Sequence, residues 1–105
     1  MPSLEKPHPV TYKIKLHKKV VTDDSKQFDD PTKEKIKRKC KELLSHSPEE
    51  VGEPLHLELK GYRKLKILNE YRIIYRVEKT QVLVFILAVG IRRDSEIYQE
   101  ALKRL

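Results

Sequence analysis

Alternating apolar and polar positions, together with one continuous apolar run, predict four β-strands. In the first, every second residue from Val10 to Leu16 is apolar, as in a strand with one buried face. Three further strands are expected at about 62–68, 71–77 and 82–90. The segments that join these three are so short that they allow only antiparallel hairpins. The last strand is apolar on both faces, which is typical of a central strand covered on each side.

Two segments have the pattern of an amphipathic helix, and a third is weaker. Asp30 can cap a helix at about 31–45, in which Pro31 suits the first position. The apolar face of this helix consists of Ile36, Cys40, Leu43 and Leu44. A closing helix is expected from about Asp94 or Ser95, with Ile97, Ala101, Leu102 and Leu105 on its apolar face. The segment 17–30 permits another helix, although its polar residues lower the helical propensity.

The order of these elements is strand, two helices, three-stranded meander and helix. It predicts a single α+β domain over residues 1–105, built on an antiparallel sheet of about four strands. Two N-terminal helices are expected to pack on one face of the sheet, and a short C-terminal helix to close the chain. Segment 47–54 contains prolines and a glycine and is expected to be a loop.

The strand at 71–77 has an unusual polar face. On one face of this strand, Arg72 and Arg76 flank Ile74. The other face carries Tyr71, Ile73 and Tyr75. With a two-residue turn at positions 69 and 70, Arg63 would oppose Arg76, so that three arginines project from one face. The pattern predicts an open basic face that meets an anion, with the helices on the reverse. Pairing of the arginines with surface carboxylates is the alternative.

The charge distribution favours a polyanionic partner. The formal net charge is +7, and residues 60–105 carry 11 Lys and Arg against 5 Asp and Glu. Nucleic acid is favoured over a membrane because no basic amphipathic helix with bulky apolar anchors is evident. Lys37 and Lys41 belong to the polar face of the helix at 31–45, which is either a solvated surface or a contact for RNA phosphates.

Other classes of protein fit the sequence poorly. Residues 1–9 lack the apolar core of a signal peptide, and the longest apolar run, 82–89, is too short to span a bilayer, so a cytoplasmic protein is expected. Cys40 is the only cysteine and cannot form an internal disulfide. The cysteine and the four histidines match no zinc pattern, and neither a metal nor another cofactor is expected.

Three motifs resemble a known family. The segments "GYRKLKI", "EYRIIY" and "GIRRDSEIYQEALKRL" occur in the order and spacing of RelE-type toxins from bacterial and archaeal toxin–antitoxin pairs. The resemblance is close over residues 55–105 and looser at 10–21. It implies a small, metal-independent endoribonuclease that enters the ribosomal A site and cuts messenger RNA. It also implies a cognate RelB-like antitoxin that holds the toxin inactive in a hetero-oligomer.

The resemblance also implies a set of site residues. Those that correspond to the family's catalytic residues are Arg63, Arg72, Arg92 and Tyr98. Further contacts with RNA are expected from Arg76, Arg93, Lys37 and Lys41. Two positions depart from the family pattern. Many members have a lysine or histidine where this chain has Ile91, and some have a basic residue where it has Leu65. These departures leave the identity of the general base open.

RNA cleavage without a metal requires the 2′-hydroxyl to attack the adjacent phosphorus in line. An arginine side chain keeps its pKa above about 12, so Arg72 and Arg92 are expected to hold phosphate oxygens and not to move protons. Tyr98 can stack on a base or accept the 2′-proton. In the register assumed above, Lys64 and Lys66 lie on the opposite face from Arg72, which argues against them as bases.

Two other functions stay open. One is that of a ParE-like relative that shares the fold and inhibits DNA gyrase by binding, without cutting RNA. The other is that of a plain basic nucleic-acid-binding module. The combination of Arg72, Arg92 and Tyr98 favours the ribonuclease, because a toxin that only binds its target does not need it.

Overall fold

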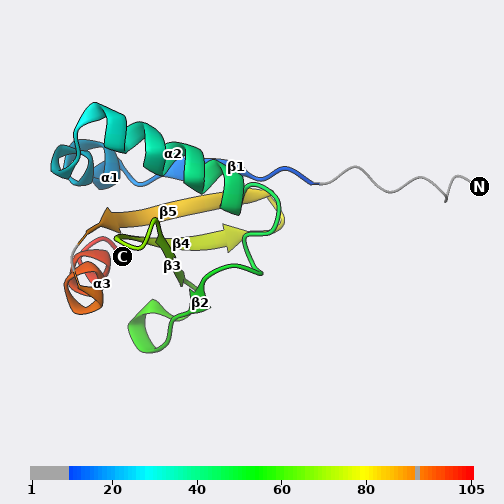
Figure 1. The fold of residues 1–105 in the computed structure, drawn as a ribbon. Coiled ribbons are helices and arrows are strands. Elements are labelled where there is room, and N and C mark those ends of the chain that lie inside the picture. Colours follow the sequence, from blue (N-terminus) through cyan, green and yellow to red (C-terminus); the bar gives the residue numbers. More distant parts are fainter. Residues whose placement is uncertain (1–9, 92) are drawn as a thin grey trace, which may run out of the picture.

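A five-stranded sheet forms the centre of the molecule (Figure 1). The computed structural model describes residues 10–91 and 93–105. The strands are β1 (Lys13–Leu16), β2 (Glu53–Pro54), β3 (Arg63–Ile67), β4 (Tyr71–Glu78) and β5 (Leu83–Gly90). Their order across the sheet is β1-β5-β4-β3-β2, so the apolar strand β5 has a neighbour on each side. The predicted α+β class and the three-stranded meander are confirmed.

The two edges of the sheet differ from the prediction. β1 pairs with β5 in parallel, with Ile14 beside Val84, so the sheet is mixed and not wholly antiparallel. The segments between β1 and β5 provide the long crossover that a parallel pair needs. β2 is an additional two-residue strand within the expected loop at 47–54. It pairs only with β3, and its Pro54 is tolerated because an edge strand can spare a donor.

One face of the sheet is covered by the N-terminal helices α1 (Lys18–Thr22) and α2 (Asp30–Leu44), with the 3₁₀ turn η2 (Asp24–Gln27) between them (Figure 1). The cap of α2 is Asp29, one residue before the expected Asp30: its Oδ1 accepts the Thr32 N–H at 2.9 Å. The predicted apolar face packs as expected, and its buried members Ile36, Cys40 and Leu44 join the core formed by Ile73, Tyr75, Val84 and Ile86.

The C-terminal helix α3 (Asp94–Leu102) lies on the opposite face of the sheet (Figure 1). Its Ile97 and Ala101 are buried against Ile74 of β4 and the Leu87–Ala88 step of β5. Ile74 is 0% exposed. The face that carries the arginines was expected to be open, and this prediction is wrong. Ile74, the apolar residue between Arg72 and Arg76 on that face, packs against α3.

The register of the β3–β4 hairpin also differs from the prediction. The turn has three residues, and two of them, Leu68 and Asn69, adopt positive φ angles of 53° and 61°. Lys66 therefore opposes Arg72, and Arg63 opposes Tyr75 and not Arg76. Since side chains alternate between the faces of a strand, a shift of one position moves every side chain of β3 to the other face.

Candidate functional site: a cationic clamp under α3

Lys64 and Arg72 form a cationic clamp that is closed by a carboxylate of α3. Arg72 Nε donates to Asp94 Oδ1 at 2.6 Å, and Lys64 Nζ donates to Asp94 Oδ2 at 2.7 Å. Arg72 Nη1 also donates to the carbonyl oxygen of Glu70 at 3.0 Å. The side chains of Lys64 and Arg72 are only 16% and 18% exposed, whereas that of Asp94 is 43% exposed. The two cations are thus held firmly, and the anion lies at the surface.

The clamp holds its members in their charged forms. The hydrogen bond to Asp94 raises the pKa of Lys64 above its ordinary value. The hydrogen bonds from Lys64 and then Arg72 lower the pKa of Asp94. At neutral pH the two cations therefore surround an ionised Asp94 carboxylate, and the exposed Glu53 carboxylate lies 3.6 Å from Lys64 Nζ.

Tyr98 is the aromatic member of the site. It lies one turn along α3 from Asp94 and is half-buried against the apolar cluster under that helix. Lys64 Nζ is 6.0 Å from the centre of its ring. An aromatic ring beside a cation is the arrangement that can stack on a nucleobase while the cation binds the neighbouring phosphate.

Lys66 extends the positive charge of the clamp along the hairpin. It is exposed and lies directly opposite Arg72 in the β3–β4 ladder. Lys64 and Lys66 were expected on the other face, and this prediction is wrong. The sequence holds an indication that would have corrected it: Leu65 and Ile67 need the buried face, which they share with Ile73 and Tyr71. The lysines between them must then lie on the face of Arg72.

Arg76 lies on the face of Arg72, as predicted, but is held by its neighbours. Its Nη1 donates to the Tyr62 hydroxyl at 2.7 Å, and its Nε pairs with Glu78. The guanidinium carbon is 4.9 Å from the ring centre of Phe85 and 5.5 Å from that of Tyr62. Stacking and hydrogen bonds of this kind fix an arginine in place.

Arg63 is separated from the clamp by the corrected register. Its Nε donates to the Val51 carbonyl at 3.2 Å and its Nη2 to the Gly52 carbonyl at 3.1 Å. The loop that contains Gly52 lies close to the backbone of β3, because a Cβ atom at Gly52 would be 2.7 Å from the Lys64 carbonyl oxygen. Gly52 also has a φ of 74°, which favours glycine. The expected grouping of Arg63 with Arg72 and Arg76 is wrong, and Arg63 instead anchors the loop before β2.

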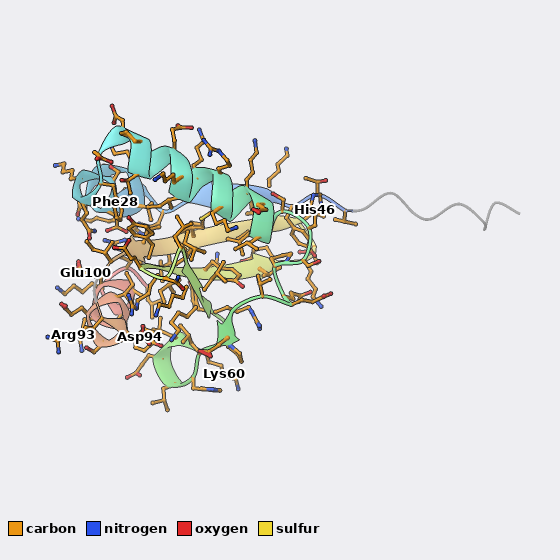
Figure 2. All side chains as sticks on the ribbon, in the orientation of Figure 1. Phe28, His46, Lys60, Arg93, Asp94 and Glu100 are labelled. Atoms are coloured by element: carbon orange, nitrogen blue, oxygen red, sulfur yellow. The ribbon has the colours of Figure 1, made fainter. Side chains whose placement is uncertain are left out.

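The other expected site residues are not members of the clamp as the structure describes it. Lys37 and Lys41 are exposed on α2, which covers the reverse face of the sheet. Arg93 is exposed and precedes the first turn of α3, where Figure 2 labels it beside Asp94. Arg92 lies outside the described residues, and its role in the site stays a prediction from the sequence.

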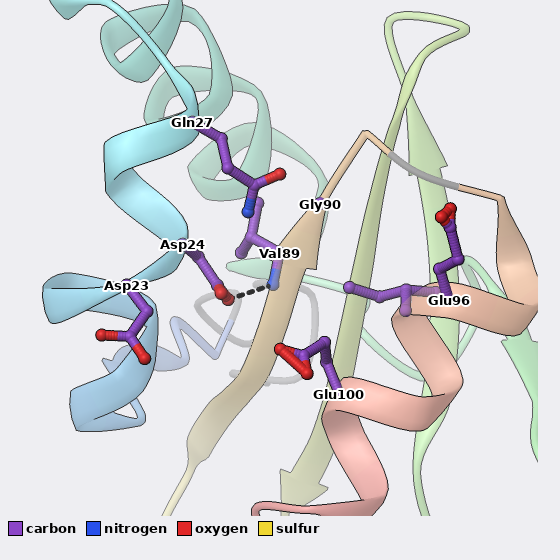
Figure 3. A pocket seen from close by; sticks show the side chains of 8 residues that line it. Asp23, Asp24, Gln27, Val89, Gly90, Glu96 and Glu100 are labelled. Carbon is purple, nitrogen blue, oxygen red and sulfur yellow. Dashed lines mark hydrogen bonds between the residues drawn. The ribbon is translucent and has the colours of Figure 1, made fainter.

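A small acidic cavity on the far side of α3 is distinct from the clamp. It has a volume of about 130 Å³ and lies between η2, the end of β5 and α3 (Figure 3). Its carboxylates come from Asp23, Asp24, Glu96 and Glu100. Within residues 10–91 and 93–105, no three His, Cys, Asp or Glu side chains are placed to hold a metal ion. Asp24 is paired with Arg104, and the other three carboxylates of this cavity disfavour a nucleic-acid ligand.

No helix within the described ranges is long and apolar enough to cross a membrane. A bilayer span would need about 20 consecutive apolar residues.

The comparisons with known proteins agree on one superfamily. A family model described as the ParE toxin of type II toxin-antitoxin system, parDE, matches residues 14–96. The mRNA interferase toxin RelE of Escherichia coli K12 is 38% identical over 74 residues, which are 70% of this chain and 76% of the relative. The mRNA interferase RelE of Shigella flexneri matches to the same extent.

Solved structures of RelE toxins share the fold. The toxin–antitoxin complex RelBE2 of Mycobacterium tuberculosis aligns with a TM-score of 0.72 and 26% identity, over 86% of this chain and all of that one. A mutant of Escherichia coli RelE in the free state aligns with a TM-score of 0.69 and 28% identity, over 90% of this chain and 98% of that one. The chain belongs to the ParE toxin family of type II toxin–antitoxin systems, in the RelE/ParE superfamily.

Proposed function

We propose that this protein is the toxin of a type II toxin–antitoxin pair and cuts messenger RNA on the ribosome. The observation that carries the proposal is the clamp of Lys64 and Arg72 with Lys66 and Tyr98 beside it, in a chain 38% identical to an mRNA interferase toxin. Converging cations and an aromatic ring can bind a phosphate and a base together. Such an enzyme works in the cytoplasm, where the ribosome is.

The proposed reaction is an in-line transesterification. A bond forms between the 2′-oxygen and phosphorus, and the bond from phosphorus to the 5′-oxygen breaks, which leaves a 2′,3′-cyclic phosphate and a 5′-hydroxyl. Arg72 and Lys64 stabilise the extra negative charge on the non-bridging oxygens. They are suited to this because their side chains are rooted in adjacent strands and are more than four-fifths buried.

Two protons must move in this reaction. One leaves the 2′-hydroxyl, and another reaches the departing 5′-oxygen. Lys66 and Tyr98 are the proposed carriers, because Lys66 lies opposite Arg72 and Tyr98 lies beside Lys64. The ribosome contributes by holding the message in the reactive geometry, since orientation alone supplies a large part of a rate enhancement.

Three arginines outside the clamp have supporting roles in the proposal. Arg92 is assigned to phosphate binding by the family motif alone. Arg93 is exposed at the start of α3 and is proposed to contact RNA. Arg76 contributes positive charge beside the clamp but keeps its contacts with Tyr62 and Glu78. We assign Lys37 and Lys41 to ribosomal RNA, because α2 faces away from the clamp.

A cognate antitoxin is the proposed protein partner. Solved relatives include a RelBE2 toxin–antitoxin complex and Escherichia coli RelE bound to an antitoxin RelB peptide. An acidic or amphipathic antitoxin segment suits a toxin with a net charge of +7. Binding of such a segment over the clamp would keep RNA out.

The test is primer extension on messages translated by programmed ribosomes, with purified toxin added. The wild-type protein is expected to leave codon-phased cuts, and Arg72→Ala and Arg92→Ala are expected to reduce cutting about 100- to 1000-fold. Arg38→Ala is the matched control, because Arg38 is exposed on α2. Uncut messages with wild-type toxin would refute the proposal. DNA gyrase inhibition in the same preparation would then support the alternative of a ParE-like binding toxin.

A further inference from the structure

The carboxylate of Asp94 occupies the clamp in the manner of a phosphate. One of its oxygens accepts from Arg72 at 2.6 Å and the other from Lys64 at 2.7 Å. A phosphodiester also presents two anionic oxygens, which Lys and Arg bind in the same charge-assisted way. A substrate phosphate and this carboxylate cannot share the two cations, because both are anions that need the same donors.

We propose that Asp94 is a resident anion that autoinhibits the free protein, and that an RNA phosphate must displace it to enter the clamp. Substrate binding is then an exchange of one anion for another. This inference rests on the proposed function in one respect, because it takes the clamp as the phosphate site. It adds an internal competitor for that site, which comes from the first turn of α3.

The exposures in the clamp indicate which partner moves. Lys64 and Arg72 are mostly buried on strands, whereas 43% of the Asp94 side chain is exposed. A rotation of the Asp94 side chain into solvent therefore empties the clamp without disturbing the sheet. Because the Asp94 carboxylate is partly exposed, its hydration after release offsets part of the lost ion-pair energy, so that an RNA phosphate can displace it but has to compete for the two cations.

The displaced carboxylate keeps a favourable position. Asp94 remains in the first turn of α3, where the positive end of the helix dipole favours a carboxylate. Ile97 and Ala101 hold α3 on the sheet whether or not Asp94 is in the clamp, because both are buried against Ile74. The helix therefore does not need the ion pairs to stay in place, and the contact is free to act as a competitor for RNA.

A different role for Asp94 makes the opposite prediction. If Asp94 positioned Lys64 and Arg72 for the substrate, its removal would loosen the clamp and weaken RNA binding. If it competes with RNA, its removal strengthens binding. The direction of the change in affinity therefore distinguishes the two roles.

The experiment measures binding of a short single-stranded RNA that is 2′-O-methylated throughout and so cannot be cut, by fluorescence anisotropy at fixed salt. Asp94→Asn is expected to bind about tenfold more tightly than the wild-type protein. Glu34→Gln is the matched control, since it removes the same charge from an exposed position on α2, and should change the affinity less than about twofold. Adding Lys64→Ala to Asp94→Asn should abolish the gain.

Equal, weaker or absent binding by Asp94→Asn would overturn the proposal. Thermal melts of each variant check the fold, and Asp94→Ser serves as a second variant because serine is also tolerated at the start of a helix. The assay needs no cleavage. A protein that binds more tightly as Asp94→Asn but never cuts ribosome-bound messages would therefore refute the proposed function and leave the anion exchange standing.

Discussion

Arg104 donates two hydrogen bonds of 2.7 Å to the two carboxylate oxygens of Asp24, which lies 80 residues earlier in the chain. The two side chains are only 5% and 6% exposed. Asp24 also accepts the Val89 N–H at 2.8 Å, and Arg104 also donates to the Leu87 carbonyl at 3.0 Å. This pair ties the end of α3 to β5 and η2. Since α3 carries Asp94 and Tyr98, the pair also positions the site.

Arg104→Ala is expected to lower the free energy of unfolding by about 3 to 5 kcal/mol, because it leaves the Asp24 carboxylate buried without its cation. Urea denaturation followed by circular dichroism measures the change. Lys103→Ala is the control and should cost less than about 0.5 kcal/mol, since Lys103 is exposed. Equal stability of the two variants would show that the pair does not hold α3.

Arg63→Ala is expected to destabilise the fold by about 2 kcal/mol while cutting on the ribosome stays at the wild-type rate. The physical reason is the loss of charge-assisted hydrogen bonds to the carbonyls of Val51 and Gly52, which hold Arg63 away from the Lys64–Arg72 clamp. Thermal melts and primer extension on the same preparation measure both quantities. A folded variant with a large loss of rate would return Arg63 to the catalytic set.

Lys66→Ala is expected to reduce cutting about 100-fold or more without changing the melting temperature, because the exposed amine contributes to the reaction and not to the core. Single-turnover cleavage on programmed ribosomes gives the rate. The matched control is Lys79→Ala, an exposed lysine in the β4–β5 turn. A full rate for Lys66→Ala would leave Tyr98 as the remaining proton carrier on this face.

Substitutions of Tyr98 separate three roles. If the ring stacks on a base, Tyr98→Phe keeps the rate and Tyr98→Ala loses it without unfolding. If the hydroxyl moves the proton, Tyr98→Phe loses about 100-fold with an unchanged melting curve. If Tyr98 is only core, Tyr98→Ala destabilises by about 3 kcal/mol or more and Tyr98→Phe is harmless. We expect stacking with a contribution to proton transfer, since Lys64 Nζ lies over the half-buried ring, 6.0 Å from its centre.

Cys40 is expected to resist alkylation in the folded protein. Burial raises the pKa of its thiol to about 12, so very little reactive thiolate is present at pH 8. Reaction with a chromogenic disulfide reagent should be slow in buffer and complete within minutes in denaturant. Rapid reaction in buffer would mean that α2 opens away from the sheet, because Cys40 belongs to the core under that helix.

The sequence by itself determined the elements and the family. Alternation located β3 and β4, and a continuous apolar run located β5, because each strand has to bury one or both faces in a chain of this size. Apolar spacing located α2 and α3, and an expected capping aspartate next to Pro31 also marked the start of α2. The motifs around Arg72 and Tyr98 indicated the superfamily, since their charged and aromatic residues occur in the order and spacing of RelE-type toxins.

Only the tertiary structure decided how these elements meet. The length of the β3–β4 turn depends on the left-handed backbone of Leu68 and Asn69, although the apolar positions Leu65 and Ile67 already indicate which face of β3 is buried. α3 packs on the face that carries the arginines because Ile74, Leu87 and Ala88 form an apolar surface there. This surface exists only after β4 and β5 have paired. The Asp94 carboxylate reaches Lys64 and Arg72 only in that arrangement, so the clamp is a product of contacts between residues 22 and 30 positions apart.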